Sequence, residues 1–556
     1  MDLVVFEYDQ DYVLECFRRG EFDFVDGVSE VGETEFFRYI GAKKILGKLA
    51  DTYPSPREKE EVPLWMYVAS NLSMRLHGVH SFHAYPYVIR CGGMLNAFGP
   101  EVARKTKHPE TGDVTLSCSG FNDKNSYDRQ TPCDQDYLRK LARATEPEQL
   151  HRWFNRDVMQ ILKQHKAFDA GGIFLGDASY LFVPDNPNYE HSVRMLFDEH
   201  NHPVDSKKIS AEQRARCQWR RCYKMVSLVH TNRSGDFFLY AGLSVVPGNR
   251  HEGPILWGLV DGFVEAVGQG VMKQLILDRG FIDGEQIGRC KQEHGIDILI
   301  PLKKNMDVYE DVLGLVREKR VKFEPYSPPP PKPPADPKPT QVPQEIRQRE
   351  KKRQKTLLQR KDPAPPPPAD KVLVRSEIAS ISDFRTWSSC LVPLHVTVNR
   401  EHYADGHTDV WMLIDTKHTG KRACARDDYR LRTGIEERHR QLKCFVDLTD
   451  FTSRKFSLIC NQVIFVALCY SLMQLFLLRM KRSALNRHTQ PRLRRQLMPT
   501  DSVIIVYYCS RFALFTTSEY TELLLTLSPE ASKKILEKIR RLRRELEQEL
   551  KVVRAP

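Results

Sequence analysis

The sequence predicts an α/β protein whose central region is a mixed sheet with helices on its faces. Three strand-like runs come first, at residues 171–183, 222–232 and 237–246, and all are rich in β-branched and aromatic residues. Runs typical of helix, strand, helix and strand then follow one another between residues 255 and 302. Three strands followed by this alternation indicate a mixed sheet covered by helices.

The composition is that of a large globular protein. The chain has 556 residues, hydrophobic residues make up 41% and charged residues 28%, which excludes disorder of the whole chain. A chain of this length favours three or four structural units and can bury a core without disulfide bonds. The 13 cysteines are scattered, which is typical of a reducing compartment. No basic, apolar leader opens the chain, so we expect no signal peptide.

One apolar run resembles a membrane span. Residues 463–478 are almost entirely apolar, but the run is shorter than a span needs and contains Ser471 and Gln474. The sequence therefore favours a buried core helix, and we expect a cytoplasmic protein that does not contact a membrane.

Proline marks the clearest boundaries. Proline-rich tracts at 327–339 and 362–370 flank a basic run at 347–361, and such tracts favour extended, exposed chain. The expected organisation begins with a separate, mostly helical region (residues 1–150), the first part of the α/β core (151–324) and a proline-rich basic insertion (325–370). A β-rich insertion subdomain (371–425), two helices that complete the core (426–480) and a helical tail (481–556) follow.

Basic charge is concentrated in two runs. The formal net charge is +12, and residues 347–361 and 533–551 contribute much of the positive charge. Such runs suit a polyanion, most often nucleic acid, although a solvated charged face explains either run alone. The second run also carries an apolar stripe at helical spacing, which predicts docking on its own domain or on a partner helix: Ile535, Ile539, Leu542, Leu546 and Leu550.

The stretch from Tyr429 to Lys443 contains the residues most informative about chemistry. On a helix that turns about 100° per residue, Tyr429, Arg432, Glu436 and Lys443 share a stripe roughly 60° wide, and apolar residues occupy the opposite side. A solvated face with ion pairs is one interpretation. The other is a phosphate-handling site, in which the carboxylate holds a metal and the other three side chains hold a DNA backbone.

Metal-assisted phosphoryl transfer needs several carboxylates, because Mg²⁺ prefers oxygen ligands. Asp177 and Asp278 each follow an apolar, strand-like run, which is a suitable mount for a ligand. An aspartate at such a place is also a common turn residue. Four other acidic residues are rivals for the same role: Asp185, Asp283, Glu285 and Asp297.

These residues carry a resemblance to a known family. Tyr429, Arg432, Glu436 and Lys443 fit Y-x2-R-x3-E-x6-K, and the pattern resembles the signature of DDE transposases of the insertion-sequence-four type. The segment LILDRGF around Asp278 resembles the block that holds the family's second aspartate, and IFLGDAS around residue 177 resembles the first. The resemblance covers roughly residues 170–479, with Thr433 in place of the family's usual tryptophan.

The resemblance implies an RNase H-like core with a β insertion before the last catalytic helix. It also implies that Asp177, Asp278 and Glu436 bind two Mg²⁺ or Mn²⁺ ions, with Glu437 as the alternative to Glu436. The reaction would nick one strand at the element's end, form a hairpin and later join the end to target DNA. In that family the phosphates are held by side chains that correspond here to Tyr429, Arg432 and Lys443.

Trp411 opens an apolar run that resembles a strand of the same family. The family's tryptophan stacks on a base flipped from the transposon end, and an indole face suits that contact. A core tryptophan remains an equal interpretation.

The expected function is that of a bacterial-type, nucleoid-associated DNA transposase. We expect it to bind terminal inverted repeats and target DNA as a homodimer, and to cleave and transfer strands with divalent metals. One alternative is a catalytically silent DNA-binding protein or repressor derived from a transposase. Another is a metal-dependent nuclease that cuts without joining.

Overall fold

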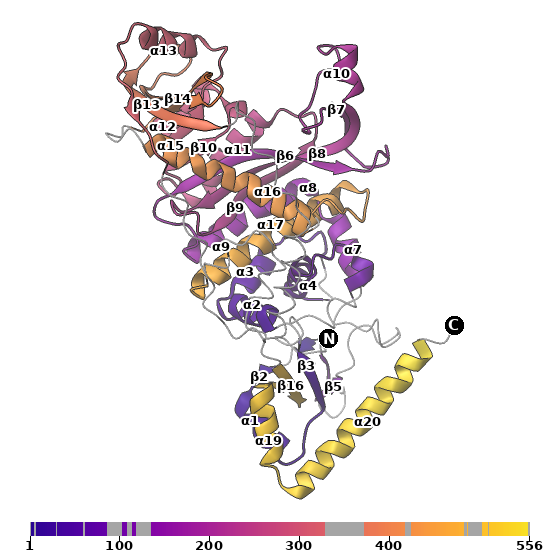
Figure 1. Cartoon of the computed structure of the whole chain (residues 1–556). Helices are drawn as coiled ribbons and strands as arrows, with labels where there is room; N and C mark the ends of the chain where they lie inside the picture. The colour runs from indigo at the N-terminus through magenta and orange to yellow at the C-terminus, as the bar shows by residue number, and fades with distance from the viewer. Residues whose placement is uncertain are drawn as a thin grey trace.

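The main body of the protein is a ten-stranded mixed sheet with helices packed against it (Figure 1). The computed structural model describes residues 2–4, 7–28, 31–58, 62–85, 103–107, 114–117, 135–328, 372–417, 424–446, 448–482, 486, 503–509 and 511–553. A smaller unit, built from the two ends of the described chain, lies below the body in this view.

Five strands at the centre of the sheet match strands that the sequence predicts. They are β6 (Ile173–Val183), β8 (Gln218–Thr231), β9 (Phe238–Pro247), β10 (Gln274–Leu277) and β11 (Asp297–Pro301). β9, β8 and β6 are antiparallel neighbours, and β10 and β11 continue beside β6 as parallel strands. The mixed α/β prediction is confirmed, and this strand order is consistent with the RNase H-like domain that the resemblance implies.

The β-rich region after the proline tract continues the same sheet. β15 (Thr408–Asp415) pairs with β11, and β14 (Leu394–Tyr403), β13 (Leu373–Phe384) and β12 (Glu324–Pro325) follow in order. The sequence predicts a β-rich insertion subdomain in residues 371–425; in the structure, the apolar end of β15 is buried where it extends the core sheet. The proline-rich segment from residue 329 to 371, with its basic run, lies outside the described residues.

A long buried helix, α17 (Phe456–Arg479), organises the core. Length and composition alone would let it cross a membrane, but 78% of its most apolar window is buried inside the protein. A helix that is apolar all round must be covered on every side. β9 covers part of it, and helices from the N-terminal region cover much of the rest: α2 (Val31–Ala42), α4 (Leu64–Leu76), α7 (Gln135–Ala144) and α8 (Pro147–Arg152).

The N-terminal helices therefore belong to the core, whereas the sequence suggested that residues 1–150 look separate. α3 (Ile45–Asp51), the π-helical turn η3 (Trp153–Val158) and α9 (Met159–Gln164) share one hydrophobic cluster with the sheet. Against the sheet pack α11 (Glu252–Val267) and α12 (Gly284–His294), and α13 (Asp307–Arg317) follows β11. The physical reason is that the apolar faces of α2, α4, α7 and α8 complete the covering of α17.

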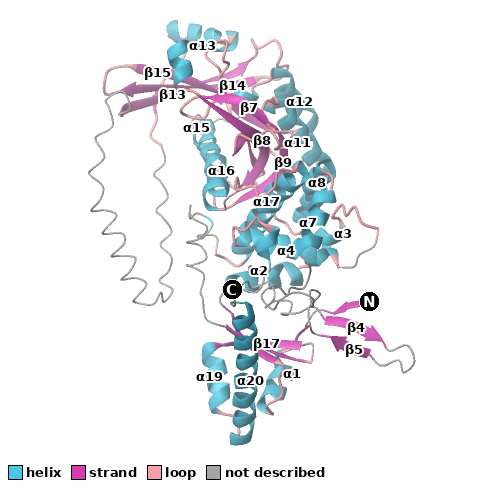
Figure 2. Cartoon of the chain, turned by 90° about the vertical axis from the view of Figure 1, so that its right-hand side faces the viewer, coloured by secondary structure: helices cyan, strands magenta, loops and turns pink. Residues whose placement is uncertain are grey.

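The two ends of the chain fold together into a terminal unit (Figure 2). Its sheet has the order β2-β17-β16-β3, formed by residues 7–8, 511–516, 503–508 and 24–28. α1 (Gln10–Arg18), α19 (Thr517–Leu525) and α20 (Pro529–Val553) complete it around a core that includes Phe17, Phe22 and Ile535. The helical tail predicted for residues 481–556 did not include β16 and β17.

The predicted stripe on the C-terminal helix is described only in part. Ile535 is buried in the terminal unit and Ile539 packs partly against the same core, so this part of the stripe docks on its own protein. The side chains of Leu542, Leu546 and Leu550 lie outside the described residues. A further small sheet joins β1 (Asp2–Val4), β4 (Ala103–Lys107) and β5 (Val114–Ser117).

Asp415 at the end of β15 leads to a stability prediction. Burial raises the pKa of Asp415 to about 7, Asp297 and Asp428 add to the rise, and the backbone N–H of Lys417 opposes it. The pKa in the unfolded chain is about 3.9, so the stability contributed by the neutral carboxyl is lost as pH rises between these values. We expect Asp415→Asn to gain stability over the wild type by roughly 1.4 kcal/mol per pH unit from about pH 5 to about pH 7, and little more from there to about pH 8, where the carboxyl is ionised in both states.

Urea unfolding of both proteins without metal, at about pH 5 and about pH 7, measures this difference. Other titrating groups, such as Asp177, are unchanged in both proteins, so their contributions to the pH dependence of stability cancel in the comparison. An equal stability difference at both pH values would contradict the prediction.

Candidate active site

Two of the predicted carboxylates lie side by side on adjacent strands, Asp177 within β6 and Asp278 just past the end of β10. β10 pairs with β6 only up to Leu277, which lies opposite Gly176. Asp278 and Asp177 are the next residues on these parallel strands, so they stand beside one another where the pairing of β10 with β6 ends. Beyond this point β6 is no longer paired on that side, and a pocket opens along it.

The predicted catalytic helix is helical but not continuous. α15 (Cys424–Tyr429) leads into a 3₁₀ turn, η6 (Arg430–Arg432), and then into α16 (Thr433–Phe445). Despite this break, Tyr429, Arg432, Glu436 and Lys443 all line the same pocket. Gly434 permits the close packing of α16, because a Cβ atom there would lie 2.6 Å from the Phe238 ring on β9.

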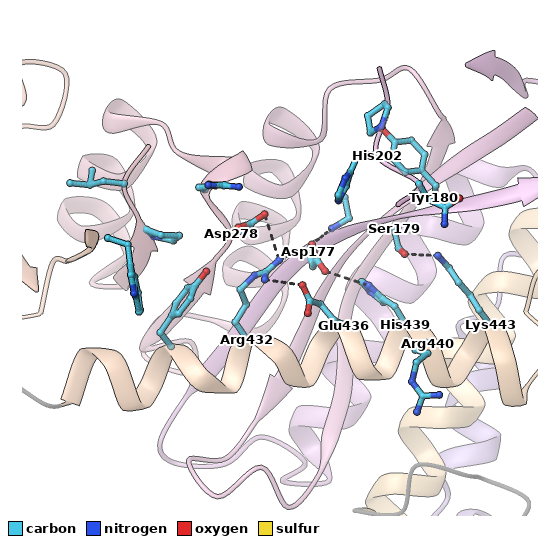
Figure 3. A pocket seen from close by; sticks show the side chains of 18 of the residues that line it. Asp177, Ser179, Tyr180, His202, Asp278, Arg432, Glu436, His439, Arg440 and Lys443 are labelled. Atoms are coloured by element: carbon cyan, nitrogen blue, oxygen red, sulfur yellow. Dashed lines mark hydrogen bonds and ion pairs between the residues drawn. The ribbon is translucent and has the colours of Figure 1, made fainter. Parts of the chain in front are cut away.

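The pocket has a volume of about 1000 Å³ and brings the predicted residues together (Figure 3). Asp177, Asp278 and Glu436 lie at its centre, from β6, the loop after β10 and α16. None of the four rival acids lines it. Three of the rivals have other roles: Asp185 pairs with two arginines of neighbouring strands, Asp283 caps the N-terminus of α12, and Asp297 pairs with Lys291.

Arg432 lies among the three carboxylates. Its Nη1 is 2.8 Å from Glu436 Oε1, and its Nη2 is 3.5 Å from Asp278 Oδ2 and 4.0 Å from Asp177 Oδ1. The arginine side chain is only 16% exposed. One largely covered guanidinium therefore lies within ion-pair distance of all three acids. The three carboxylates are thus close enough together to share one positive charge.

Asp177 is the most buried of the three acids, and this changes its titration. Burial raises the pKa of Asp177 to about 7; Arg432 and the N–H of Ala178 oppose the rise, and the two other acids add to it. His439 Nδ1 lies 3.6 Å from Asp177 Oδ2, and its Nε2 lies 2.9 Å from Ser227 Oγ. Burial lowers the pKa of His439 to about 3, so the ring is neutral and its contact with the carboxyl is polar, not ionic.

Lys443 extends the site along β6. Its Nζ donates a hydrogen bond of 2.6 Å to Ser179 Oγ, two residues beyond Asp177. Burial lowers the pKa of Lys443 to about 8, while the charge of Asp177 opposes this shift. The lysine thus carries its charge at neutral pH and loses it in mildly basic solution.

Two aromatic residues line the opposite end of the pocket. Trp411 on β15 is partly buried, and its ring centroid lies 6.3 Å from that of Tyr429 at an angle of 47°. The guanidinium carbon of Arg426 lies over the same indole, 5.3 Å from its ring centroid. Burial raises the pKa of Tyr429 to about 12, so its hydroxyl stays protonated at neutral pH.

Sequence reasoning missed several residues of this pocket. His439 follows Glu436 by three positions, so its place on the same helix face was a usable signal. Ser179 alternates with Asp177 along one strand, which places both on the same face. Arg220, on β8, had no local signal, because only the pairing of β8 with β6 brings it to the pocket.

The donor set fits a hard divalent cation. Three carboxylates from separate elements surround one buried positive group, and Mg²⁺ and Mn²⁺ prefer such oxygen ligands. Within the described residues, no three His, Cys, Asp or Glu side chains already enclose a common metal position. Arg432 would therefore have to move for Asp177, Asp278 and Glu436 to share a metal.

The family comparison agrees with this geometry. A family model described as "Transposase DDE domain" matches residues 196–472, just under half of the chain. The match includes Asp278, Trp411 and all four residues of the signature but begins after Asp177. No curated protein matches the chain. Domains of this family generally use divalent metals, and they bind DNA. Residues 196–472 are therefore a transposase DDE domain, the domain of a family of phosphoryl-transfer nucleases that act in DNA transposition.

Proposed function

We propose that this protein is a cut-and-paste transposase of the insertion-sequence-four type, with Asp177, Asp278 and Glu436 as its catalytic carboxylates. It binds the terminal inverted repeats of its element, nicks one strand, forms a hairpin with the freed 3′-hydroxyl and transfers the end to target DNA. The observation that carries the proposal is the convergence of these acids around Arg432 in a pocket of the DDE domain.

The charge pattern of the pocket supports a polyanionic substrate. On one side of the acids lie Arg279 and Lys304, and on the other lie Arg220, Arg440 and Lys443. Among the described residues, the three central acids are the only carboxylates in the lining. A phosphate backbone that crosses the pocket would thus meet cations on both sides of the position where it is cut.

Two Mg²⁺ or Mn²⁺ ions held by the acids would supply Lewis-acid activation of the attacking and leaving oxygens. Arg432, released from the acids when they bind metal, is free to contact a backbone phosphate. Tyr429 stays protonated and donates a hydrogen bond, and Lys443 adds positive charge to the same backbone. Trp411, which lines the pocket, offers its indole ring to an unpaired base.

The assembly is also part of the proposal. We assign end recognition to the N-terminal region, residues 1–150, and expect a homodimer on the paired ends. We place the protein in the bacterial cytoplasm, associated with the nucleoid. The DDE domain implies DNA binding, which supports the proposed association with DNA.

A cleavage assay tests the reaction. The probe is a labelled duplex with the terminal repeat of the element that encodes this protein, incubated with Mg²⁺ or with EDTA. We expect a nick at the repeat's end and then a hairpin, both only with Mg²⁺. Tight, salt-sensitive binding without cutting would support a catalytically silent repressor instead, and cutting without hairpin or joining would support a simple nuclease.

The pKa of Lys443 gives a pH prediction for DNA binding. Because its positive charge is lost as pH rises through about 8, its phosphate contact weakens above that pH. We expect wild-type affinity for the repeat duplex in EDTA to fall by about tenfold from about pH 7 to about pH 9. Lys443→Arg keeps its charge over this range and should lose much less. Parallel pH profiles of the two proteins, measured by fluorescence anisotropy, would contradict this role.

A further inference from the structure

The active-site pocket continues past the carboxylates along β6. Beyond Ser179, its lining consists of Tyr180, Phe182, Asn201, His202 and Arg220, a set that we call the Phe182 subsite. Figure 3 shows Tyr180 and His202 on the side of Asp177 away from Arg432. The Trp411 end lies on the other side of the acids, so the acids stand between two separate binding surfaces.

Arg220 is held in a defined position in this subsite. Its guanidinium carbon lies 3.4 Å from the centroid of the Phe182 ring, and its Nη1 donates to Asn201 Oδ1. The buried ring of Phe197 packs against Phe182 with the ring centroids 5.0 Å apart. The centroids of Phe197 and Tyr180 are also 5.0 Å apart. A guanidinium stacked on a supported ring loses little further freedom when it binds an anion.

The charge of Arg220 is not offset locally. Among the described residues no carboxylate pairs with it, since its polar contact is to a neutral amide. Two neighbouring arginines are paired differently: Arg221 on the same strand and Arg194 on β7 (Val193–Phe197) both contact Asp185. Arg220 is therefore the cation of this edge that is available to a ligand in the pocket.

Three residues of the subsite, Asn201, His202 and Arg220, belong to a hairpin arm of residues 193–221. The arm contains β7 (Val193–Phe197), the short helix α10 (Ala211–Ala215) and the start of β8, and it projects from the body in Figure 1. Asp185 contacts both strands of the arm through its two arginines. A backbone that crosses the acids from the Trp411 end would next run along this arm.

We propose that the Phe182 subsite binds the DNA strand on the side of the scissile phosphate opposite Trp411, with Arg220 in contact with a backbone phosphate. This inference rests on the proposed function and identifies a second half of its substrate site. Two sources of DNA share this chemistry: the flanking DNA before the cut and the target DNA during joining. The guanidinium edge not bound to Asn201 is the part that meets the phosphate.

The test for flanking DNA compares repeat duplexes that carry no flank or a flank of about one helical turn. Affinities are measured by anisotropy in EDTA over a range of salt concentrations. For the wild type we expect the flank to raise affinity, and for Arg220→Gln we expect that gain to fall by about tenfold, with a salt slope reduced by about 1. The duplex without flank should bind both proteins equally.

The matched control is Lys207→Glu, an exposed cation on the same arm that does not line the pocket. It should resemble the wild type on both duplexes, and Arg220→Glu should show a larger loss than Arg220→Gln. Unchanged circular dichroism and thermal midpoints exclude misfolding as the cause. If Arg220→Gln and Arg220→Glu bind flanked DNA as Lys207→Glu does, the flanking strand is not the ligand of this subsite.

The test for target DNA uses a precut repeat end and a supercoiled plasmid with Mg²⁺. Joining reduced about tenfold in Arg220→Gln, with flank binding unchanged, assigns the subsite to target DNA. Wild-type behaviour of the variant in both tests would overturn the inference alone, provided that the wild type cleaves its repeat. A wild type that neither cuts nor joins would overturn the proposed function and this inference together.

Discussion

Replacing any one of the three central carboxylates by its amide is expected to reduce DNA nicking by at least about a thousandfold. Asp177→Asn, Asp278→Asn and Glu436→Gln keep the size of each side chain and remove one charged metal ligand. Loss of that ligand withdraws several kcal/mol of transition-state stabilisation, and each 1.4 kcal/mol is about tenfold in rate. Single-turnover nicking of the labelled repeat duplex with Mg²⁺ measures the effect.

The control for this prediction is the adjacent acid on α16. Glu437 accepts hydrogen bonds from Arg440 and Gln441 and does not line the pocket. Glu437→Gln should therefore nick within a few-fold of the wild type. DNA affinity in EDTA should rise in the three amide variants, because each loses a negative charge that repels the phosphates. Normal nicking by Glu436→Gln beside inactive Glu437→Gln would show that Glu437 is the catalytic residue.

The second large effect concerns the helix at the centre of the core. Phe465 on α17 is fully buried. Its ring centroid lies 5.8–6.3 Å from those of Tyr53, Tyr67 and Trp153. Phe465→Ala removes these contacts and leaves a cavity between α17 and the N-terminal helices. We expect the free energy of unfolding to fall by about 3–5 kcal/mol.

Urea denaturation followed by tryptophan fluorescence suits this measurement, because Trp153 lies against Phe465. Met480→Ala, at the exposed end of the same helix, is the control and should change stability by about 0.5 kcal/mol or less. A loss below about 1 kcal/mol for Phe465→Ala would contradict the packing of N-terminal helices around α17.

Local sequence patterns predicted the elements of the catalytic region well. β6, β8 and β9 have compact β-branched and aromatic signals, and α16 has one polar and one apolar face, whereas β7 was not predicted. These signals depend only on residues that are close together in the sequence, so they can be recognised without knowledge of the fold. Spacing along α16 then placed Glu436 beside Arg432 and Lys443, even though the 3₁₀ turn at 430–432 was not predicted.

Contacts between distant segments were not predictable in this way. Val25 of β3 pairs with Val506 of β16, and nothing near either residue specifies a partner so far along the chain. The same holds for β15, which was expected in an insertion subdomain but pairs with β11. Arg220 reaches the pocket only through such pairing. The missing part of the site therefore depends on tertiary structure, whereas Asp177, Asp278 and Glu436 stood next to recognisable patterns.

The most direct test of the account is a crystal structure of the protein with its repeat duplex and Mn²⁺, with anomalous scattering used to locate the metal. The account predicts manganese peaks bounded by oxygens of Asp177, Asp278 and Glu436 at about 2.2 Å, with Arg432 turned away onto a DNA phosphate. A complex with the DNA strand in the pocket, no manganese at these three carboxylates and Arg432 still between them would contradict it.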